Sequence, residues 1–462
     1  MRINGNTAES VKIAYIGGGS RGWARVLMSD LAKEEKLSGE VCLYDIDYAA
    51  AKDNETIGNM YSALDDAKGK WVYKAVNSLK EALTGADFVI ISILPGTFDE
   101  MESDVHAPEK YGIYQSVGDT VGPGGIVRGL RTVPMYREIA EGVRDFCPDA
   151  WVINYTNPMS MCVRALYEYF PKIKAFGCCH EVFGTQGLVG VAYEELTGEK
   201  VCKDDVKINV LGINHFTWIT SVSIGGKDMF PVYADFAKKY YESGFGITDD
   251  GWLNNFFANG NRVKFDLFRR YGVIAAAGDR HLAEFCPGDW YLASPERAHE
   301  WKFGLTPVSW RKKDLETRIE KTKALLRGEE SPKIVETGEE GVRQMKAILG
   351  LSEPLVTNVN LPNVGQMPGV PAGAVVETNA VFSHGDVRPV ASGELPNGVT
   401  SLVMRHIYEQ ETTVDAAISG DYGKAYSAFT DDPLMRASLS DSRKLFDEML
   451  SATAKYLPGY RG

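Results

Sequence analysis

The residues best suited to chemistry lie in two short segments near the middle of the chain. Cys179 and His180 are adjacent within Cys178-Cys179-His180-Glu181-Val182, and His215 lies in Asn214-His215-Phe216-Thr217-Trp218. A thiolate and an imidazole can bind a divalent transition-metal ion and leave positions open for a substrate with neighbouring hydroxyl groups. A closed structural zinc site needs four ligands at short paired spacings, and the sequence has no Cys-x-x-Cys pair. We therefore interpret Cys179 and His215 as metal ligands, with a buried cysteine and two hydrogen-bonded histidines as the alternative.

A glycine-rich turn near the start of the chain predicts a dinucleotide site. The run Gly17-Gly18-Gly19-Ser20-Arg21-Gly22 fits Gly-x-Gly-x-x-Gly and lies between an apolar strand pattern and a helical pattern. Gly17 would allow the tight turn, Gly19 would let backbone amides approach a pyrophosphate, and Gly22 would let the helix pack closely on the strand. Asp45 ends the next strand, where a carboxylate takes ribose hydroxyls, so it favours NAD over NADP. The alternative is a structural loop beside an unrelated surface acid.

Three later segments would complete a pocket around this nucleotide. The strand at Ile91-Ser92-Ile93 stops abruptly at Pro95 and Gly96, so we expect Ser92 and Ile93 to line the nicotinamide side. Asp119 is the only acid in the glycine-rich run 118–125, and it either binds a sugar hydroxyl or lies in a simple turn. Asn157 precedes Pro158; its amide would bind ligand or, as the simpler interpretation, cap a helix.

The elements that must position these residues alternate along the first 180 residues. Short apolar runs typical of strands occupy residues 11–16, 41–44, 88–93, 151–154 and 175–177. Helix-length segments separate several of them, which predicts an α/β fold with a doubly wound parallel sheet, a Rossmann-type domain over residues 1–200. Residues 201–462 mix short strands with helical stretches such as 315–326. They predict a mixed α+β C-terminal domain that closes over the nucleotide.

Composition narrows the class of partner. The 462 residues, 44% of them hydrophobic, are enough for one large core or two domains with an extensive interface. A net charge of −12 disfavours nucleic acid and anionic membrane, which leaves a small molecule as the expected ligand. Seven scattered cysteines are typical of thiols kept reduced in a cytoplasm. With no signal-peptide pattern at the start and no apolar run near the roughly 18 residues of a membrane span, we expect a cytoplasmic protein.

Taken in order, these segments resemble the family 4 glycoside hydrolases, which are NAD- and manganese-dependent glycosidases. The nucleotide domain of that family is similar to that of lactate and malate dehydrogenases. The resemblance covers nearly the whole chain and also rests on the run Asn360-Leu361-Pro362-Asn363-Val364-Gly365. It implies a glycoside as substrate and a homodimer or homotetramer, with the C-terminal domain contributing to substrate binding, metal binding and oligomerisation.

The resemblance also implies a mechanism of oxidation, elimination, addition and reduction, outside the usual two-carboxylate scheme. NAD takes a hydride from C3 of the sugar, the ketone acidifies the C2 proton, a base removes that proton, and the C1 leaving group departs. Water then adds at C1, and NADH returns the hydride. A Mn²⁺ ion on Cys179 and His215 would chelate the C2 and C3 oxygens and stabilise the enediolate. Ligand type leaves cobalt and nickel open as alternatives.

The residue after the metal cysteine differs between branches of the family. It is Asp in members that cleave phosphoglycosides, and here it is His180, as in members that act on unphosphorylated α-glycosides. Cys-His-Glu-Val is similar to the motif of α-galacturonidases, which makes an α-galacturonide the expected substrate and α-glucuronides, α-glucosides and α-galactosides the alternatives. His180 is then the predicted general acid, or it orients the thiolate or the substrate. A uronate carboxylate would favour a bidentate arginine, for which Arg280, Arg128 and Arg131 are candidates.

The base that removes the C2 proton is harder to assign. Phosphoglycosidase members use a tyrosine in the C-terminal domain, whereas the comparable region here reads Ala277-Gly278-Asp279-Arg280-His281. Asp279 matches the position at which α-glucosidase-like members carry an acid, so we predict it as the base, with His281 second. Arg280 and His281 are also predicted to bind substrate. Alternatively, Asp279 pairs with Arg280 or caps a helix.

Aromatic residues of the second half offer a sugar platform, although such residues more often lie in a core or a subunit interface. The candidates are Trp218, Trp252, Phe256, Phe257 and Trp290.

Two other classes of protein are compatible with a nucleotide turn. An NAD-dependent dehydrogenase of a hydroxy acid or sugar would accumulate NADH, but it gives no reason for placing Cys179 beside His180. A non-catalytic NAD(H)-binding redox sensor would need neither a metal ion nor an ordered acid and base. Nothing in the chain resembles a recognition helix or another partner module.

Overall fold

A ten-stranded sheet organises the molecule, and its parallel part has the predicted doubly wound order. The structure, a computed structural model, describes all residues except 247–255, 258, 458 and 460–462. The parallel strands follow one another in space as β7 (Lys174–Gly177), β6 (Trp151–Asn154), β5 (Phe88–Ile91), β2 (Thr7–Ile16), β3 (Leu37–Tyr44) and β4 (Lys70–Val76). The order reverses between β2 and β5, which creates the crevice where nucleotides bind in such sheets. The α/β prediction is thus confirmed.

The observed strands differ from the predicted ones in two instructive ways. The strand predicted at 88–93 ends at Ile91, so Ser92 and Ile93 belong to the loop that follows it. The edge strand β4 was missed. Its Lys70, Val72 and Lys74 are exposed while the residues between them are buried, so it has the period-two pattern of a strand covered on one face instead of a continuous apolar run.

Strands from the second half of the chain extend the same sheet. Strand β12 (Leu355–Pro362) pairs antiparallel with β7 and with β13 (Val375–Ser383), which pairs with β14 (Asp386–Pro389). The short β1 (Arg2–Asn4) pairs with β2. Because the sheet takes strands from both sides of residue 200, the proposed domain boundary there remains a prediction.

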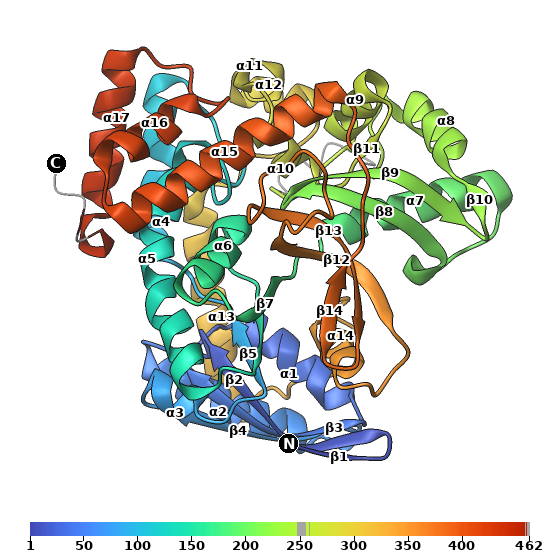
Figure 1. The fold of residues 1–462 in the computed structure, drawn as a ribbon, viewed down its shortest axis with the longest axis vertical. Coiled ribbons are helices and arrows are strands. Elements are labelled where there is room, and N and C mark those ends of the chain that lie inside the picture. The colour runs from blue at the N-terminus through green and yellow to red at the C-terminus, as the bar shows by residue number, and fades with distance from the viewer. Residues whose placement is uncertain (247–255, 258, 458, 460–462) are drawn as a thin grey trace.

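A second, four-stranded sheet lies in the C-terminal half. It contains β8 (Val206–Ile213), β9 (Phe216–Ile224), β10 (Lys227–Asp228) and β11 (Ile274–Ala275). Together with the helices that follow, it gives the mixed α+β half that the sequence predicted. In Figure 1 this sheet lies at the upper right, above β12 and β13.

Helices cover both faces of the nucleotide sheet. Those of the first half are α1 (Trp23–Lys33), α2 (Tyr48–Ser62), α3 (Leu79–Leu83), α4 (Phe98–His106), α5 (Gly122–Phe146), α6 (Met159–Tyr169) and α7 (Glu181–Thr197). The next are α8 (Phe230–Tyr240), α9 (Arg262–Tyr271), α10 (Asp279–Glu284), α11 (Gly288–Tyr291), α12 (Pro295–Glu300), α13 (Val308–Leu326) and α14 (Gly341–Ile348). The last three are α15 (Asn397–Ser419), α16 (Tyr422–Asp431) and α17 (Leu439–Ala452).

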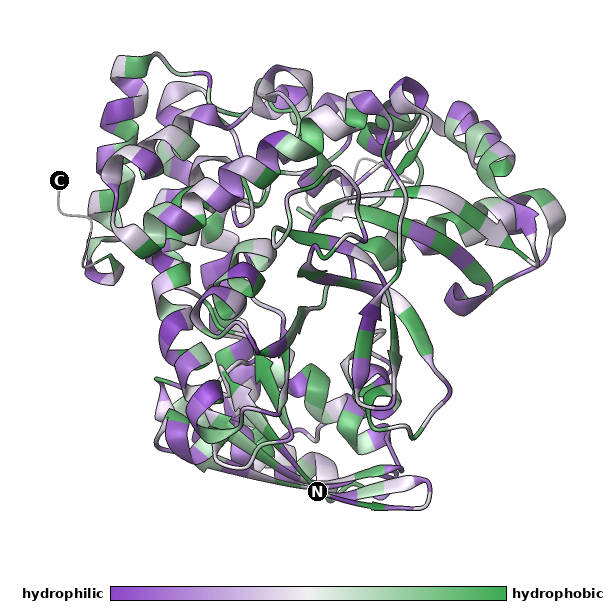
Figure 2. Cartoon of the chain, viewed as in Figure 1, coloured by the Kyte–Doolittle hydropathy of each residue, from purple (hydrophilic) through white to green (hydrophobic). Residues whose placement is uncertain are grey.

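One hydrophobic core joins the two halves of the chain. Val127, Leu130 and Val133 of α5 are fully buried in the same cluster as Phe216 of β9 and Val403 of α15. Figure 2 shows hydrophobic residues on the central strands, while the outer helices carry both hydrophobic and hydrophilic residues. None of the described helices combines the length and the apolar character that a membrane crossing requires.

Candidate active site

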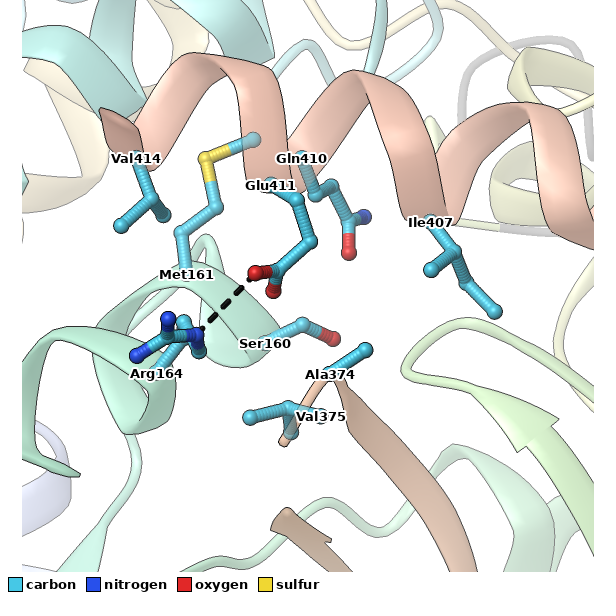
Figure 3. A pocket seen from close by; sticks show the side chains of 9 residues that line it. All are labelled: Ser160, Met161, Arg164, Ala374, Val375, Ile407, Gln410, Glu411 and Val414. Atoms are coloured by element: carbon cyan, nitrogen blue, oxygen red, sulfur yellow. Dashed lines mark hydrogen bonds and ion pairs between the residues drawn. The ribbon is translucent and has the colours of Figure 1, made fainter. Parts of the chain in front are cut away.

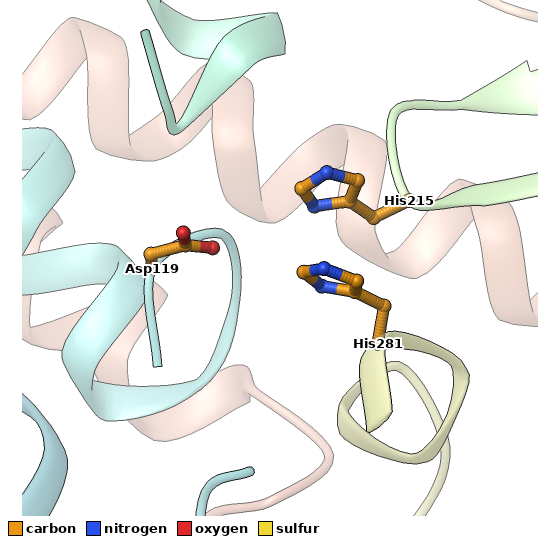
Figure 4. A group of neighbouring side chains, drawn as sticks. All are labelled: Asp119, His215 and His281. Carbon is orange, nitrogen blue, oxygen red and sulfur yellow. The ribbon is translucent and has the colours of Figure 1, made fainter. Parts of the chain in front are cut away.

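Three side chains from distant parts of the chain converge at one point. Asp119 lies in the loop before α5, His215 in the turn between β8 and β9, and His281 in α10. Their potential ligand atoms all lie within 4.8 Å of one another, and Figure 4 shows the Asp119 carboxylate facing both imidazole rings. Two imidazoles and a carboxylate suit a divalent ion such as manganese, cobalt or nickel. The residues present therefore fit the metal ion that the sequence predicted.

His215 occupies a tight turn that aims its side chain at this cluster. Ile213 pairs with Phe216, so only Asn214 and His215 connect the two strands, and His215 has a left-handed φ of 64°. That conformation is uncommon outside glycine and is often found at functional sites. Burial and the neighbouring His281 lower the pKa of His215 to about 3. The imidazole is therefore neutral, as a metal ligand must be.

A threonine sets the tautomer of His215. The hydroxyl of Thr120 donates to Asp119 Oδ1 (2.7 Å) and lies 2.9 Å from His215 Nδ1. Because that hydroxyl proton points to Asp119, Nδ1 must donate to the Thr120 oxygen. The Nε2 lone pair of His215 is thereby left available for a metal ion.

Asp119 is held as a carboxylate by its surroundings. Burial alone would raise its pKa, but His215, His281 and Arg128 hold the pKa of Asp119 well below its usual range. Asn157 Nδ2 donates to Asp119 Oδ2 (3.4 Å), and no side chain caps α6, so the helix-capping alternative for Asn157 is wrong. The structure thus brings three predicted substrate residues, Asp119, Asn157 and His281, together with the predicted metal ligand His215.

Cys179 lies two residues after the end of β7, and its thiol contacts Asn214 in the turn that carries His215. Its Sγ is not among the described ligand atoms that lie within 4.8 Å of one another around His215, so its role as a metal ligand remains a prediction. Burial, Glu377 and Glu181 raise the pKa of the Cys179 thiol well above its ordinary value, while the Asn214 side chain opposes this. The thiol is therefore protonated unless a bound cation displaces the proton.

His180 and Glu181 begin α7 and point to different surroundings. The His180 side chain is about half-exposed, and its Nδ1 lies 3.1 Å from Glu339 Oε1, which raises the pKa of His180. Glu181 accepts a hydrogen bond from the Gly278 amide (2.8 Å), and its other oxygen lies 3.8 Å from His281 Nε2. Burial opposes its ionisation, but His281 and His215 lower the pKa of Glu181 to about 2. Glu181 was not predicted as a site residue, although it belongs to the motif that was singled out.

Asp279 is buried away from solvent and bound to the start of a helix. Its two oxygens accept hydrogen bonds from the backbone amides of Val263 (3.3 Å) and Lys264 (3.1 Å), in the first turn of α9. Burial raises the pKa of Asp279 to about 6. This is the capping arrangement that the sequence left open as an alternative, with α9 as the capped helix. The role of Asp279 as the C2 base remains a prediction.

The three arginines considered for a uronate differ in their availability. Arg131 donates to both oxygens of Asp104 (2.9 and 2.5 Å) and to the Pro95 carbonyl, so it has no free edge for a substrate. Arg128 donates from Nε to the Asn157 carbonyl, and its buried Nη1 has no partner among the described residues. Arg280 donates from one nitrogen to Ser116 and Thr306, while its buried Nε has no partner in the same set.

The glycine turn and the loop after β5 meet at the switch point of the sheet. A Cβ on Gly17 would lie 2.0 Å from the Ser92 carbonyl oxygen, so only glycine fits there. The Gly19 amide donates to Asp45 Oδ2 (2.8 Å), and the Thr156 hydroxyl accepts from the Ile93 amide (2.9 Å). These contacts bring the predicted nucleotide residues to one edge of the sheet. The glycines 17–19 leave room for a pyrophosphate, and the neighbouring Asp45 carboxylate suits a ribose, so this edge fits a dinucleotide.

The close approach to a strand that was predicted for Gly22 is made by Gly18 instead. A Cβ on Gly18 would lie 2.7–2.9 Å from Leu43 of β3, so Gly18 makes the close approach to a strand. At Gly22 the added atom would instead meet the guanidinium of Arg318 from α13. The prediction that Gly22 lets α1 pack on the strand is wrong, because the Arg318 side chain, and no strand, faces that position.

The aromatic residues considered for a sugar platform lie in separate surroundings in the structure. Trp218 is fully buried in the core, and Trp290 packs 4.1 Å from the Arg270 guanidinium. Phe257 is exposed and lies 4.9 Å from the Arg280 guanidinium, whereas Trp252 lies outside the described residues.

Two buried acids that the sequence analysis missed support the site. Glu377 of β13 accepts hydrogen bonds from Asn214 (3.1 Å) and Asn358 (2.6 Å), so it holds the residue before His215. Glu284 of α10 accepts from the amides of Val117 and Gly118 (2.7 and 2.9 Å) and holds the loop before Asp119. Neither acid belongs to a recognised motif, so only the folded chain reveals these roles.

A separate pocket lies between α6, α15 and β13. Figure 3 shows that the Arg164–Glu411 ion pair (3.1 Å) closes one side of it, with Ser160, Gln410 and apolar side chains around the rest. None of the predicted site residues lines this pocket. We therefore place the candidate active site at the Asp119 cluster.

Family models, curated relatives and solved structures all match this chain over nearly its full length. The family model for family 4 glycosyl hydrolases matches residues 12–194, and the model for their C-terminal domain matches residues 210–435. An α-galacturonidase from Thermoanaerobacterium saccharolyticum is 64% identical over 100% of this chain and 99% of its own. The crystal structure of a Bacillus subtilis protein described as a glucosidase, lplD, is 52% identical, with a TM-score of 0.91 over 96% of this chain and 100% of that one. A 6-phospho-α-glucosidase from gut microorganisms, in complex with NAD and Mn²⁺, shares the fold at 20% identity, with a TM-score of 0.79 over 97% and 99% of the two chains. The chain therefore belongs to the family 4 glycosyl hydrolases.

Proposed function

We propose that this glycoside hydrolase cleaves α-galacturonides, with NAD and a divalent metal ion bound side by side. The observation that carries the proposal is the 64% identity to an α-galacturonidase across the whole chain. The convergence of Asp119, His215 and His281 in a metal-type cluster supports the chemistry. The Cys-His-Glu-Val motif supports the substrate. α-Glucuronides, α-glucosides and α-galactosides are the alternative substrates within the family.

NAD would lie at the switch point of the sheet. We propose that the turn from Gly17 to Gly22 holds the pyrophosphate, Asp45 the ribose, and Ser92 with Ile93 the nicotinamide side. When bound, NAD would accept and return a hydride, and the metal ion would polarise neighbouring sugar oxygens. The 6-phospho-α-glucosidase solved with NAD and Mn²⁺ supports both cofactors.

We propose metal ligands from two sources, the sequence motifs and the cluster in the structure. His215 is supported by both, since the sequence predicts it as a ligand and it belongs to the cluster. Asp119 offers a ligand atom within the same 4.8 Å, and the Cys179 thiol adjoins the Asn214 side chain next to His215. Manganese is the proposed ion, and this donor set would also accept cobalt or nickel.

The general acid and the C2 base are proposed from the protonation state and the solvent exposure of the candidate side chains. His180 is half-exposed, and Glu339 raises its pKa, which favours the protonated form that a general acid for the leaving oxygen needs. The predicted base Asp279 has both oxygens bound to α9, whereas the second candidate His281 lies in the cluster. If His281 Nε2–H faces Glu181, the buried Nδ1 is unprotonated and free to take a proton. We therefore favour His281 as the base and give Asp279 the positioning of α9 beside it.

A uronate carboxylate needs an arginine with free N–H groups. Arg280 is nearly buried, adjoins His281 in sequence, and keeps its Nε without a partner among the described residues. We propose Arg280 for this contact, with Arg128 as the second candidate and with Asp119 and Asn157 on the sugar hydroxyls. A homodimer or homotetramer remains the proposed assembly.

The proposal is tested by hydrolysis of aryl α-galacturonides beside α-glucuronides, α-glucosides and α-galactosides, with NAD, Mn²⁺ and a thiol reductant. NADH absorbance is followed in the same reactions. Galacturonide cleavage without NADH accumulation is the expected result. Cleavage of a neutral glycoside alone would refute the uronate. NADH formed in proportion to substrate, with no aglycone released, would identify a dehydrogenase instead, and no turnover of any substrate would favour a redox sensor.

A further inference from the structure

A second group of ionisable side chains lies apart from the proposed active site. It consists of His406 and Glu409 on α15 and Asp432 directly after α16, and their potential ligand atoms also lie within 4.8 Å of one another. All three are buried, with His406 fully so and the two acids exposed by 4% or less. Two carboxylates inside a protein require compensation by a positive charge or by protons.

The hydrogen bonds of His406 point its free nitrogen into this group. His406 Nε2 lies 2.9 Å from the Phe285 carbonyl oxygen, which can only accept, so Nε2 carries the proton. In the neutral ring, Nδ1 then presents a lone pair, and it lies 3.3 Å from Glu409 Oε2 without a hydrogen bond. A histidine that donates one ring N–H to a backbone carbonyl and turns the other nitrogen inward has the arrangement usual for metal-ligating histidines.

The carboxylates lack donors that would account for their burial. No N–H donor of the described residues reaches either oxygen of Glu409, whose polar neighbours are His406 and the Asp432 carboxyl. Asp432 accepts one backbone amide on each oxygen, from Leu434 (2.7 Å) and Gly122 (2.8 Å), which leaves further lone pairs. The neighbouring Arg405 directs its guanidinium to the Asp431 carbonyl.

We propose that His406, Glu409 and Asp432 bind a second divalent metal ion, distinct from the ion of the proposed active site. One imidazole nitrogen and two carboxylates suit a first-row ion such as zinc or manganese. A divalent cation would also balance the charges of the Glu409 and Asp432 carboxylates, and it would bind His406 Nδ1 and a Glu409 oxygen, which have no hydrogen-bond donor. The three side chains are buried from solvent, so we assign the ion a structural role.

The position of this metal site links it to the architecture of the active site. Asp432 holds the Gly122 amide at the start of α5, just after the loop of Asp119, and His406 holds the Phe285 carbonyl at the end of α10, which carries His281. An ion on α15 would therefore fix both of the segments that bring Asp119 and His281 together. The proposal does not depend on which glycoside is cleaved.

Metal analysis of the full-length protein tests the proposal. Protein from cells grown with added zinc, manganese, cobalt and nickel is dialysed in its native state against EDTA, and the retained metal is measured by plasma mass spectrometry. We expect about one retained ion per chain, because the ligands are buried. The substitution His215→Ala should leave this ion in place, whereas Glu409→Gln, which keeps the size of the side chain, should remove it.

Glu411→Gln is the matched control, since Glu411 lies on the same helix but pairs with Arg164 outside the group. It should retain the ion. X-ray absorption of the retained metal in the unsubstituted protein should show only nitrogen and oxygen ligands at about 2.0–2.2 Å. Absence of retained metal in the unsubstituted protein, sulfur among the ligands, or equal retention in Glu409→Gln would each overturn the proposal. The first two results need no variant, so they stand even if Glu409→Gln fails to fold.

Discussion

His215 and His281 lie face to face as a stacked pair, with ring centroids 3.8 Å apart and planes 28° from parallel. His215 is buried and His281 is 13% exposed, and desolvation lowers the pKa of each, so two neutral imidazoles adjoin one carboxylate. Without a cation the stack brings two unprotonated nitrogens next to Asp119. With a divalent ion on His215 and Asp119, the free nitrogen of His281 would lie beside the metal ion as the proposed base.

The first prediction concerns Thr120, whose hydroxyl joins His215 Nδ1 to Asp119. Thr120→Val keeps the shape but removes the hydrogen bonds that fix the tautomer of His215. We expect Mn²⁺ affinity to fall about 10- to 100-fold, as is usual when an outer partner of a metal ligand is lost. Affinity is measured by metal titration of chelator-treated protein, with NAD binding as a test of folding.

Thr120→Ser is the control for this experiment, because it restores the hydroxyl and loses only a methyl group. It should bind Mn²⁺ within a few-fold of the unsubstituted protein. Equal affinity in all three proteins would show that Thr120 does not orient a metal ligand.

The second prediction separates the two candidates for the C2 base. Asp279 accepts two backbone amides of α9, so Asp279→Asn should lower the free energy of unfolding by about 1–2 kcal/mol, as for a lost helix cap. It should retain exchange of the C2 proton with solvent deuterium, whereas His281→Gln should abolish it. Exchange is followed by NMR of product formed in D₂O with saturating NAD and Mn²⁺. Loss of exchange in folded Asp279→Asn protein would restore Asp279 as the base.

The sequence predicted the nucleotide half well because its signals are local. The turn from Gly17 to Gly22, Asp45 and the apolar strands are read from short windows, and the sheet order confirmed the fold class. Strand β4 was missed because Lys70 and Lys74 interrupt its apolar residues. The strands β12 to β14 gave no sign that they would join the nucleotide sheet, because that pairing is decided by tertiary contacts.

The candidate site was only partly predictable for a similar reason. Asp119, His215 and His281 were each singled out, but no spacing in the sequence indicates that their side chains converge. The sequence left helix capping by Asp279 open but did not show which helix it caps, because the acid follows α9 in sequence, whereas capping residues are sought just before a helix. Glu377, lone in an apolar strand, carries no motif.

The third prediction is a pH dependence set by Glu339. The Glu339 carboxylate, 3.1 Å from His180 Nδ1, raises the pKa of the imidazole, so the proposed acid keeps its proton to higher pH than a free histidine. Glu339→Gln removes this effect and should move the alkaline limb of the kcat profile to lower pH. The shift should be modest, because His180 is half-exposed and solvent screens the pair. An alkaline limb that stays in place would exclude His180 as the titrating acid.

The fourth prediction concerns the choice of a uronate over a neutral sugar. Arg280 keeps Nε without a partner among the described residues, and a charged hydrogen bond contributes about 1.5–3 kcal/mol. Arg280→Gln should therefore lower kcat/KM for an aryl α-galacturonide about 10- to 100-fold while changing that for the matching α-galactoside much less. Arg128→Gln serves as the comparison, because Arg128 also has an unpartnered nitrogen but binds the Asn157 carbonyl. If Arg280→Gln slows both substrates by the same factor, the arginine supports the site without selecting the carboxylate; if only Arg128→Gln changes the ratio, the uronate contact belongs to Arg128.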